Sequence, residues 1–135
     1  MSSAVPDSPF VLDASALLAL LFDEPGADIV RGCLRTGVIG AVNLAEVLAK
    51  LSDHGLPVHE AARAVAILGL DVVPMTPSQA ERSAGMRVVT RPVGLSLGDR
   101  ACLALAAELG AAAVTADRGW AGVAEAAGVS VQLIR

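Results

Sequence analysis

The chain has 135 residues, of which 54% are hydrophobic and 18% are charged, and its formal net charge is −4 at pH 7. A chain of this length is expected to form one domain, over residues 1–135, with a core of its own. The net negative charge argues against a protein that binds nucleic acid through overall positive charge.

The amino-terminal segment and the longest apolar run indicate a cytoplasmic protein with no membrane span. Residues 1–7 lack the basic region and the cleavage site of a signal peptide. The longest uninterrupted apolar run, Ala16–Phe22, is too short to cross a bilayer. Because the mean hydropathy is nevertheless +0.62, we expect apolar surface to be buried in a homodimer or in a partner complex.

Short apolar runs alternate with helical patterns along the chain. Strands are expected at Phe10–Asp13, Val38–Ala41, Asp71–Met75, Ala112–Ala116 and Val129–Ile134. Helices are expected at Ser15–Leu21, Gly26–Arg35, Leu44–Asp53, Val58–Leu68, Ser78–Val89, Gly98–Leu109 and Arg118–Ala127. This alternation predicts an α/β fold of three layers, with a parallel sheet of about five strands covered by helices on both faces.

Local signals support the limits of these elements. Apolar residues from Leu44 to Leu51 and from Cys102 to Leu109 recur at i, i+3, i+4 and i+7, as on one face of a helix. Gly110 and Gly128 stand just before predicted strands, where the C-caps of helices belong. Both cysteines lie in apolar helical stretches without a Cys-x-x-Cys pair, which predicts buried, reduced thiols.

Four acidic residues stand where predicted strands lead into helices: Asp13, Glu46, Asp99 and Asp117. Ligand sites in parallel α/β sheets form beyond the carboxyl ends of the strands, so these acids are expected to converge on one pocket. Crowded carboxylates repel one another unless a cation lies between them, and oxygen ligands suit Mg²⁺ or Mn²⁺ better than zinc. A site of this kind cuts or transfers phosphates.

Each acid also has a structural explanation. Ser96–Asp99 and Asn43–Glu46 have the spacing of capping boxes, and Asp13 and Asp117 can act as N-caps of the helices that follow. Ser, Thr or Asn would cap equally well, however, so capping does not explain why all four residues are acidic.

Positive charge is concentrated in the second half of the chain. Residues 82–118 contain five arginines and three acids, and two of those acids are candidate metal ligands. Arg100 and Arg118 each follow a candidate ligand and are therefore candidates to hold a phosphate; the alternative is an exposed residue at the start of a helix. Trp120 is expected in the core or in an interface rather than stacked on a base, and His54 and His59 are expected in a loop or at a helix end.

The segments around the acids resemble those of PIN-domain ribonucleases, and specifically VapC-type toxins of type II toxin–antitoxin pairs. The segments, in order and nearly end to end, are Val11-Leu-Asp13-Ala-Ser15, Val42-Asn-Leu-Ala-Glu46-Val, Leu95-Ser-Leu-Gly-Asp99-Arg and Val114-Thr-Ala-Asp117-Arg-Gly-Trp120. The stretch from Leu56 to Pro92 matches only in outline. Gly98 and Gly119 stand at positions that vary in the family, which leaves the metal site unaffected.

The resemblance implies a single PIN domain with endoribonuclease activity that depends on Mg²⁺ or Mn²⁺. The four acids would hold one or two metal ions, and a metal-activated water would attack the phosphodiester of an RNA substrate. Small polar residues would support the site, namely Ser15, Asn43 and Thr115. The resemblance also implies a homodimer that a cognate antitoxin inhibits.

Three alternatives were weighed against this function. Receiver domains and aspartyl-phosphate phosphatases share an acidic pocket on an α/β sheet, but they need a late Lys or an Asp-x-Asp motif, and the only Lys here is Lys50. A housekeeping RNA-processing enzyme stays possible within the nuclease class. A non-catalytic PIN-like module that binds RNA or protein is the alternative outside it, and the sequence does not identify which RNA would be cut.

Overall fold

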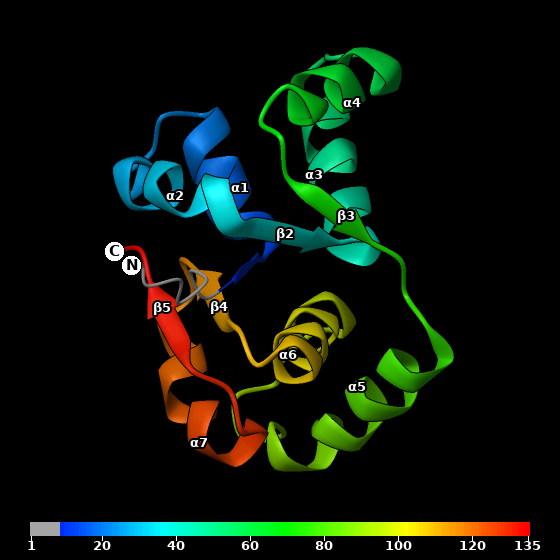
Figure 1. Ribbon diagram of the computed structural model, residues 1–135, viewed down its shortest axis with the longest axis vertical. Helices are drawn as coiled ribbons and strands as arrows, with labels where there is room; N and C mark the ends of the chain where they lie inside the picture. Colours follow the sequence, from blue (N-terminus) through cyan, green and yellow to red (C-terminus); the bar gives the residue numbers. More distant parts are fainter. Residues whose placement is uncertain (1–8) are drawn as a thin grey trace, which may run out of the picture.

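Five parallel strands form one sheet in the computed structural model, which describes residues 9–135 (Figure 1). The amino-terminal residues 1–8, where the absence of a signal peptide was inferred, lie outside the described residues. The strand order is β3-β2-β1-β4-β5. The strands are β1 (Phe10–Leu12), β2 (Gly37–Gly40), β3 (Asp71–Val73), β4 (Ala112–Thr115) and β5 (Val131–Leu133). All five predicted strands are therefore confirmed, with ends that differ by one or two residues.

Helices connect the strands, as a parallel sheet requires. The α-helices of the described residues are α1 (Ala14–Leu21), α2 (Ala27–Cys33), α3 (Ala41–Asp53), α4 (Val58–Ala66), α5 (Pro77–Val89), α6 (Leu97–Leu109) and α7 (Ala124–Ala127). The continuous helix predicted over Arg118–Ala127 is wrong. A 3₁₀ segment, Arg118–Gly122, precedes the short α7, and the two glycines within it, Gly119 and Gly122, disfavour a regular α-helix.

Two apolar cores lie on opposite faces of the sheet. Because successive residues of a strand point to opposite faces, Leu12 and Val114 pack with α1, α2, α3 and α4, whereas Val11 and Ala113 pack with α5 and α6. Figure 1 shows α1 and α2 on one side of the sheet and α5, α6 and α7 on the other. The predicted three-layer α/β/α fold is confirmed.

The strand order reverses at the centre of the sheet, and this places the predicted acids. From β1 the chain continues to β2 and β3 on one side and later returns to β4 and β5 on the other. Asp13 directly follows β1, and its backbone N–H donates to the Val114 carbonyl of β4 at 3.0 Å. Asp13 and the end of β4 therefore lie at the point where parallel α/β sheets open a crevice for ligands.

Other local predictions also hold. Gly110 and Gly128 are left-handed C-caps with φ of 60° and 71°, a conformation that residues with a Cβ rarely adopt. Cys33 and Cys102 are free and buried. Among the described helices, none has the length and apolar character needed to cross a membrane.

We predict that Leu103→Ala destabilises the fold by about 2–5 kcal/mol, because the substitution leaves a cavity beside the sheet. Leu103 is 0% exposed in the core that α5 and α6 cover. The matched control is Ile67→Ala at a side chain that is 84% exposed, where a change within about 0.5 kcal/mol is expected. Urea unfolding measures both. Equal losses in the two variants would contradict this assignment of the core.

Candidate functional site

The carboxylate of Asp13 is buried at the end of the central strand and is only 4% exposed. Its Oδ1 accepts hydrogen bonds from the backbone N–H of Ala16 at 2.8 Å and from the Ser15 hydroxyl at 2.7 Å. Its Oδ2 accepts one from the Thr115 hydroxyl at 2.6 Å. The bond from Ala16 confirms that Asp13 caps α1, but a cap has no need of burial to this depth.

Ser15 and Thr115 link this carboxylate to the segment that carries the last acid. The Thr115 hydroxyl accepts from the backbone N–H of Asp117 at 3.0 Å, and the Ser15 hydroxyl accepts from that of Ala116 at 3.0 Å. The Asp117 carboxylate in turn accepts from the backbone N–H of Gly119 at 2.8 Å, the capping contact that was predicted. The two hydroxyls thus fix the end of β4 against the start of α1.

The capping box predicted for Asn43 and Glu46 is wrong. The chain passes directly from β2 into α3, so Gly40 is the N-cap and Asn43 lies inside the first turn of the helix. Asn43 is 1% exposed, and its Nδ2 donates to Glu46 Oε1 at 2.9 Å and to the Gly98 carbonyl at 3.1 Å. Capping of α3 therefore does not explain why residue 46 is acidic. The Asn43 amide links the Glu46 carboxylate to the Gly98 carbonyl at the start of α6.

Gly98 leaves space for the side chain of Glu46. This close contact between residues 98 and 46 was not predicted from the sequence. A Cβ at this position would lie 2.7 Å from Glu46 Cδ, closer than packed carbon atoms approach. The absence of a side chain at Gly98 therefore lets the Glu46 carboxylate reach the residue before Asp99. The contact joins α3 to α6. Because these helices are far apart in the sequence, no local sequence pattern indicates the contact.

Asp99 has two roles at the start of α6. The capping box is confirmed, since the Ser96 hydroxyl accepts from the Asp99 N–H at 3.2 Å and Asp99 Oδ2 accepts from the Ser96 N–H at 3.0 Å. Its negative charge also acts on two other carboxyl groups. Burial, opposed by the hydrogen bonds and assisted by the charge of Asp99, raises the pKa of Asp13 to about 6. Burial, together with the charge of Asp99, also raises the pKa of Glu46.

The thiol of Cys102 shows that three of the acids share one region. Burial raises the pKa of this thiol, and the charges of Asp13, Asp99 and Glu46 raise it further. Cys102 lies on the inner face of α6, where its Sγ donates to the Val11 carbonyl at 3.8 Å. The charges of these three carboxylates therefore all reach the thiol on the inner face of α6.

The donor set fits a hard divalent cation. Within residues 9–135 none of the four acids forms a salt bridge, and the buried Oδ1 of Asn43 accepts no hydrogen bond. In the same residues no three Asp, Glu, His or Cys side chains are close enough together to hold a metal ion by themselves. Mg²⁺ often binds through one or two carboxylates and keeps several waters, so the ligand chemistry is adequate without a tighter cluster.

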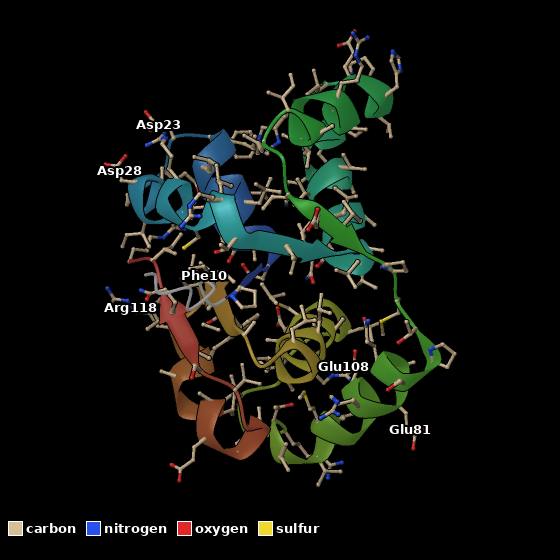
Figure 2. All side chains as sticks on the ribbon, in the orientation of Figure 1. Phe10, Asp23, Asp28, Glu81, Glu108 and Arg118 are labelled. Atoms are coloured by element: carbon tan, nitrogen blue, oxygen red, sulfur yellow. The ribbon has the colours of Figure 1, made fainter. Side chains whose placement is uncertain are left out.

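The two predicted phosphate-binding arginines point in different directions. Arg100 turns towards α5, where its Nη1 donates to the Ser83 carbonyl at 3.1 Å. Arg118 projects from the surface beside β5 (Figure 2), and its Nε donates to the Arg135 carbonyl at 3.2 Å. The structure therefore keeps Arg100 next to a pocket beside Asp99 and directs Arg118 to the carboxyl-terminal segment.

Trp120 and the two histidines occupy structural positions, and the backbone N–H of Trp120 donates to the Asp117 carbonyl at 3.2 Å. Trp120 is fully buried in the core formed with α5 and α6, which confirms its structural role. His54 follows α3 and bonds the Lys50 carbonyl through Nδ1 at 2.9 Å. Its ring contacts that of Phe22 at a tilt of 40°, with ring centroids 4.8 Å apart. His59 is exposed in α4.

Comparison with known proteins identifies one family and one fold. The model of the PIN domain family matches residues 10–126. No curated protein sequence matches the chain. Among solved structures, the chain is similar to DNA-bound VapBC from Salmonella typhimurium, with a TM-score of 0.73, 15% identity and coverage of 96% of this chain and 100% of that one.

Two further structures show the same fold. A toxin–antitoxin complex from Klebsiella pneumoniae has a TM-score of 0.68 and 19% identity, covering 93% of this chain and 97% of that one. VapBC-5 from Mycobacterium tuberculosis has a TM-score of 0.58 and 23% identity, covering 96% of this chain and 99% of that one. At such identities the likeness concerns the fold.

We predict that the Asp13 carboxyl makes the metal-free protein less stable as the pH rises. Its pKa is raised from 3.8 in the ordinary carboxyl to about 6 in the folded protein. Between pH 3.8 and about pH 6, the Asp13 carboxyl is protonated in the native state and ionised in the unfolded state. The free energy of unfolding therefore falls by about 3 kcal/mol as the pH rises through this range. The stabilisation that the protonated Asp13 carboxyl provides is fully present below pH 3.8 and is lost above about pH 6.

Urea unfolding of wild type and Asp13→Asn, from about pH 4 to about pH 6.5, isolates this effect. The stability of wild type relative to the variant should fall across this range. Asp53→Asn, at an exposed acid near the end of α3, is the control and should show no such trend. A difference between wild type and Asp13→Asn that stays constant or rises with pH would contradict the prediction.

Proposed function

The chain belongs to the PIN domain family, and from this premise we propose that it is a metal-dependent endoribonuclease, the toxin of a VapC-type toxin–antitoxin pair. One observation carries the proposal. Asp13, Glu46 and Asp99 act electrostatically on one another or on a shared thiol, and no basic side chain neutralises them in residues 9–135. A divalent cation is the natural counter-charge for such a group.

Asp13, Glu46 and Asp99 would hold the metal, and Asp117 would complete the site or hold a second ion. A bound Mg²⁺ or Mn²⁺ supplies a more acidic water and neutralises charge on the phosphodiester. The residues of the chain position these ligands. Ser15 and Thr115 orient the two oxygens of Asp13, and Asn43 orients Glu46.

The proposed partners are an RNA substrate, a cognate antitoxin and a second copy of the chain. Similar structures are described as toxin–antitoxin complexes and as VapBC bound to DNA, which supports an antitoxin. A homodimer is supported by exposed apolar side chains such as Val58 and Val88, which are 56% and 65% exposed. We take residues 1–135 as a single PIN domain acting in the cytoplasm, where its RNA is found.

The non-catalytic module is the second candidate, and one observation favours it. Within the described residues no three potential ligands are gathered closely enough to bind a metal without water or RNA. The two candidates predict different effects when the negative charge of a proposed metal ligand is removed. Only the nuclease would lose its function.

We predict that RNA cleavage by the purified protein requires Mg²⁺ or Mn²⁺ and that Asp99→Asn lowers it roughly a thousand-fold or more. A metal site contributes several kcal/mol to the transition state, which corresponds to a loss of this size. Asn keeps an oxygen that can accept the Ser96 N–H, so the melting temperature should change little. Asp53→Asn is the matched control and should cleave like wild type. Equal activity in both variants, or no cleavage of a panel of structured RNAs, would favour the non-catalytic module.

We predict that Gly98→Ala inactivates the enzyme without unfolding it. The new Cβ would displace the Glu46 carboxylate, and a displacement of about 1 Å can cost roughly a hundred-fold in rate. Gly85→Ala is the control, since residue 85 also lies in a helix but a Cβ there meets no atom within 4 Å. That variant should keep full activity and gain about 0.5–1 kcal/mol of stability. Full cleavage activity in Gly98→Ala would show that the position of Glu46 does not matter.

A further inference from the structure

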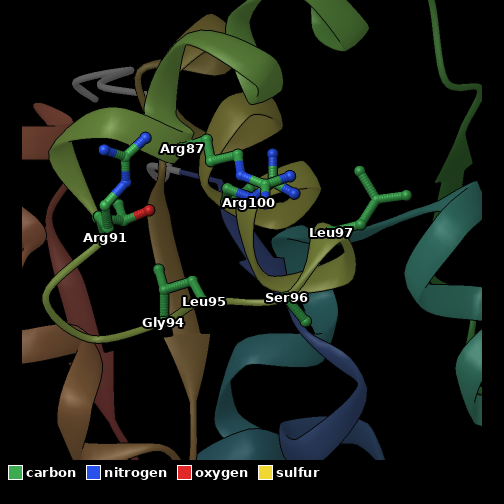
Figure 3. A pocket seen from close by; sticks show the side chains of 8 residues that line it. Arg87, Arg91, Gly94, Leu95, Ser96, Leu97 and Arg100 are labelled. Atoms are coloured by element: carbon green, nitrogen blue, oxygen red, sulfur yellow. The ribbon is translucent and has the colours of Figure 1, made fainter.

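A pocket lies next to the start of α6, the helix that carries Asp99. This pocket has a volume of about 470 Å³ and is formed by the end of α5, the loop that follows and the first turn of α6. Three arginines line it: Arg87, Arg91 and Arg100. Figure 3 shows the guanidinium groups of Arg87 and Arg100 reaching into it from the two helices.

The pocket carries positive charge without a counter-charge. No acidic residue is among those that line it. Across residues 9–135 none of the three guanidinium groups forms a salt bridge. Arg87 lies in the last turn of α5 and Arg91 in the turn that follows, and because both line one pocket their like charges repel. A bound anion would relieve this repulsion.

Hydrogen-bond donors in the pocket wall are also free. Arg100 uses Nη1 to bond the Ser83 carbonyl, whereas within residues 9–135 the guanidinium groups of Arg87 and Arg91 donate to no acceptor. The first turn of α6 adds backbone N–H groups and the positive end of the helix dipole. Arginine forks match the oxygens of a phosphate, which can accept several such bonds at once.

The position of the pocket indicates which phosphate it would take. Ser96 lines the pocket and also forms the capping box with Asp99. The arginine pocket and the carboxylate site are therefore separated by one turn of helix. A polynucleotide whose scissile phosphate lies at the carboxylates would continue directly past the arginines.

We propose that the arginine pocket binds a backbone phosphate of the RNA strand, close to the phosphate that is cut. The identity of the ligand as RNA rests on the proposed function, whereas the anion site rests on the pocket itself. The pocket gives a chain of net charge −4 a local surface that attracts a polyanion, separate from the acidic centre.

The test is the binding of a fluorescein-labelled single-stranded RNA in the presence of a chelator, followed by fluorescence anisotropy over a series of salt concentrations. The double variant Arg87→Gln/Arg91→Gln removes two charges from the pocket and leaves Arg100 on its Ser83 carbonyl. The control, Arg63→Gln/Arg82→Gln, removes the same charge from exposed positions in α4 and α5 outside this pocket.

The pocket variant should bind RNA roughly ten- to hundred-fold more weakly. The slope of log affinity against log salt should decrease by about 0.7, because one phosphate contact on a single strand contributes about 0.7. The control should stay within about two-fold of wild type. Equal weakening in the two double variants would show that net charge alone matters and would overturn the proposal.

Two outcomes separate this proposal from the proposed function. If no metal supports cleavage but the pocket variant selectively loses RNA binding, phosphate binding by the arginine pocket is supported and the nuclease function is contradicted. If metal-dependent cleavage is found while the RNA affinity of the pocket variant matches that of the control variant, the nuclease function is supported and phosphate binding by the arginine pocket is contradicted. Displacement of RNA by polyglutamate at lower concentration than by polyphosphate of equal charge would assign the pocket to a protein carboxylate and would also overturn the proposal.

Discussion

A carboxylate buried at the end of a central strand has to be solvated by the protein, and the hydrogen bonds of Asp13 meet this need. They come from the backbone and the Ser15 hydroxyl of α1 and from the Thr115 hydroxyl of β4. The same hydroxyls accept from the backbone after β4. The two hydroxyls therefore join the central strands to α1 around one buried carboxyl group, whose pKa burial raises to about 6.

The start of α6 keeps opposite charges apart. Asp99 and Arg100 are neighbours in the sequence, and successive residues of a helix point about 100° apart. The Asp99 charge acts on Asp13 and Glu46, while Arg100 bonds the Ser83 carbonyl of α5. A direct ion pair between them would neutralise both groups. Helical geometry thus maintains two charged sites of opposite sign within one turn.

Local features were predictable from the sequence, and contacts between distant segments were not. Apolar runs identified the strands, and the capping roles of Asp13 and Asp99 follow from residues within three positions of each. Asn43 was misassigned because α3 begins at Ala41, after the N-cap Gly40, which has no side chain to form a capping bond. Its bond to the Gly98 carbonyl spans 55 positions, so no local pattern reveals why residue 98 lacks a side chain. The arginine pocket likewise depends on the packing of α5 against α6.

The pairing of β1 with β4 has a consequence for the timing of folding. The bond from Thr115 to Asp13 spans 102 positions, and β1 has no neighbour on that side until β4 has been made. Non-local parallel pairing of this kind forms late, and a chain under synthesis folds from its amino terminus. A nascent chain therefore holds Asp13, Glu46 and Asp99 before it holds the structure that arranges them. The arrangement of these carboxylates is therefore completed only after nearly all of the chain has been translated.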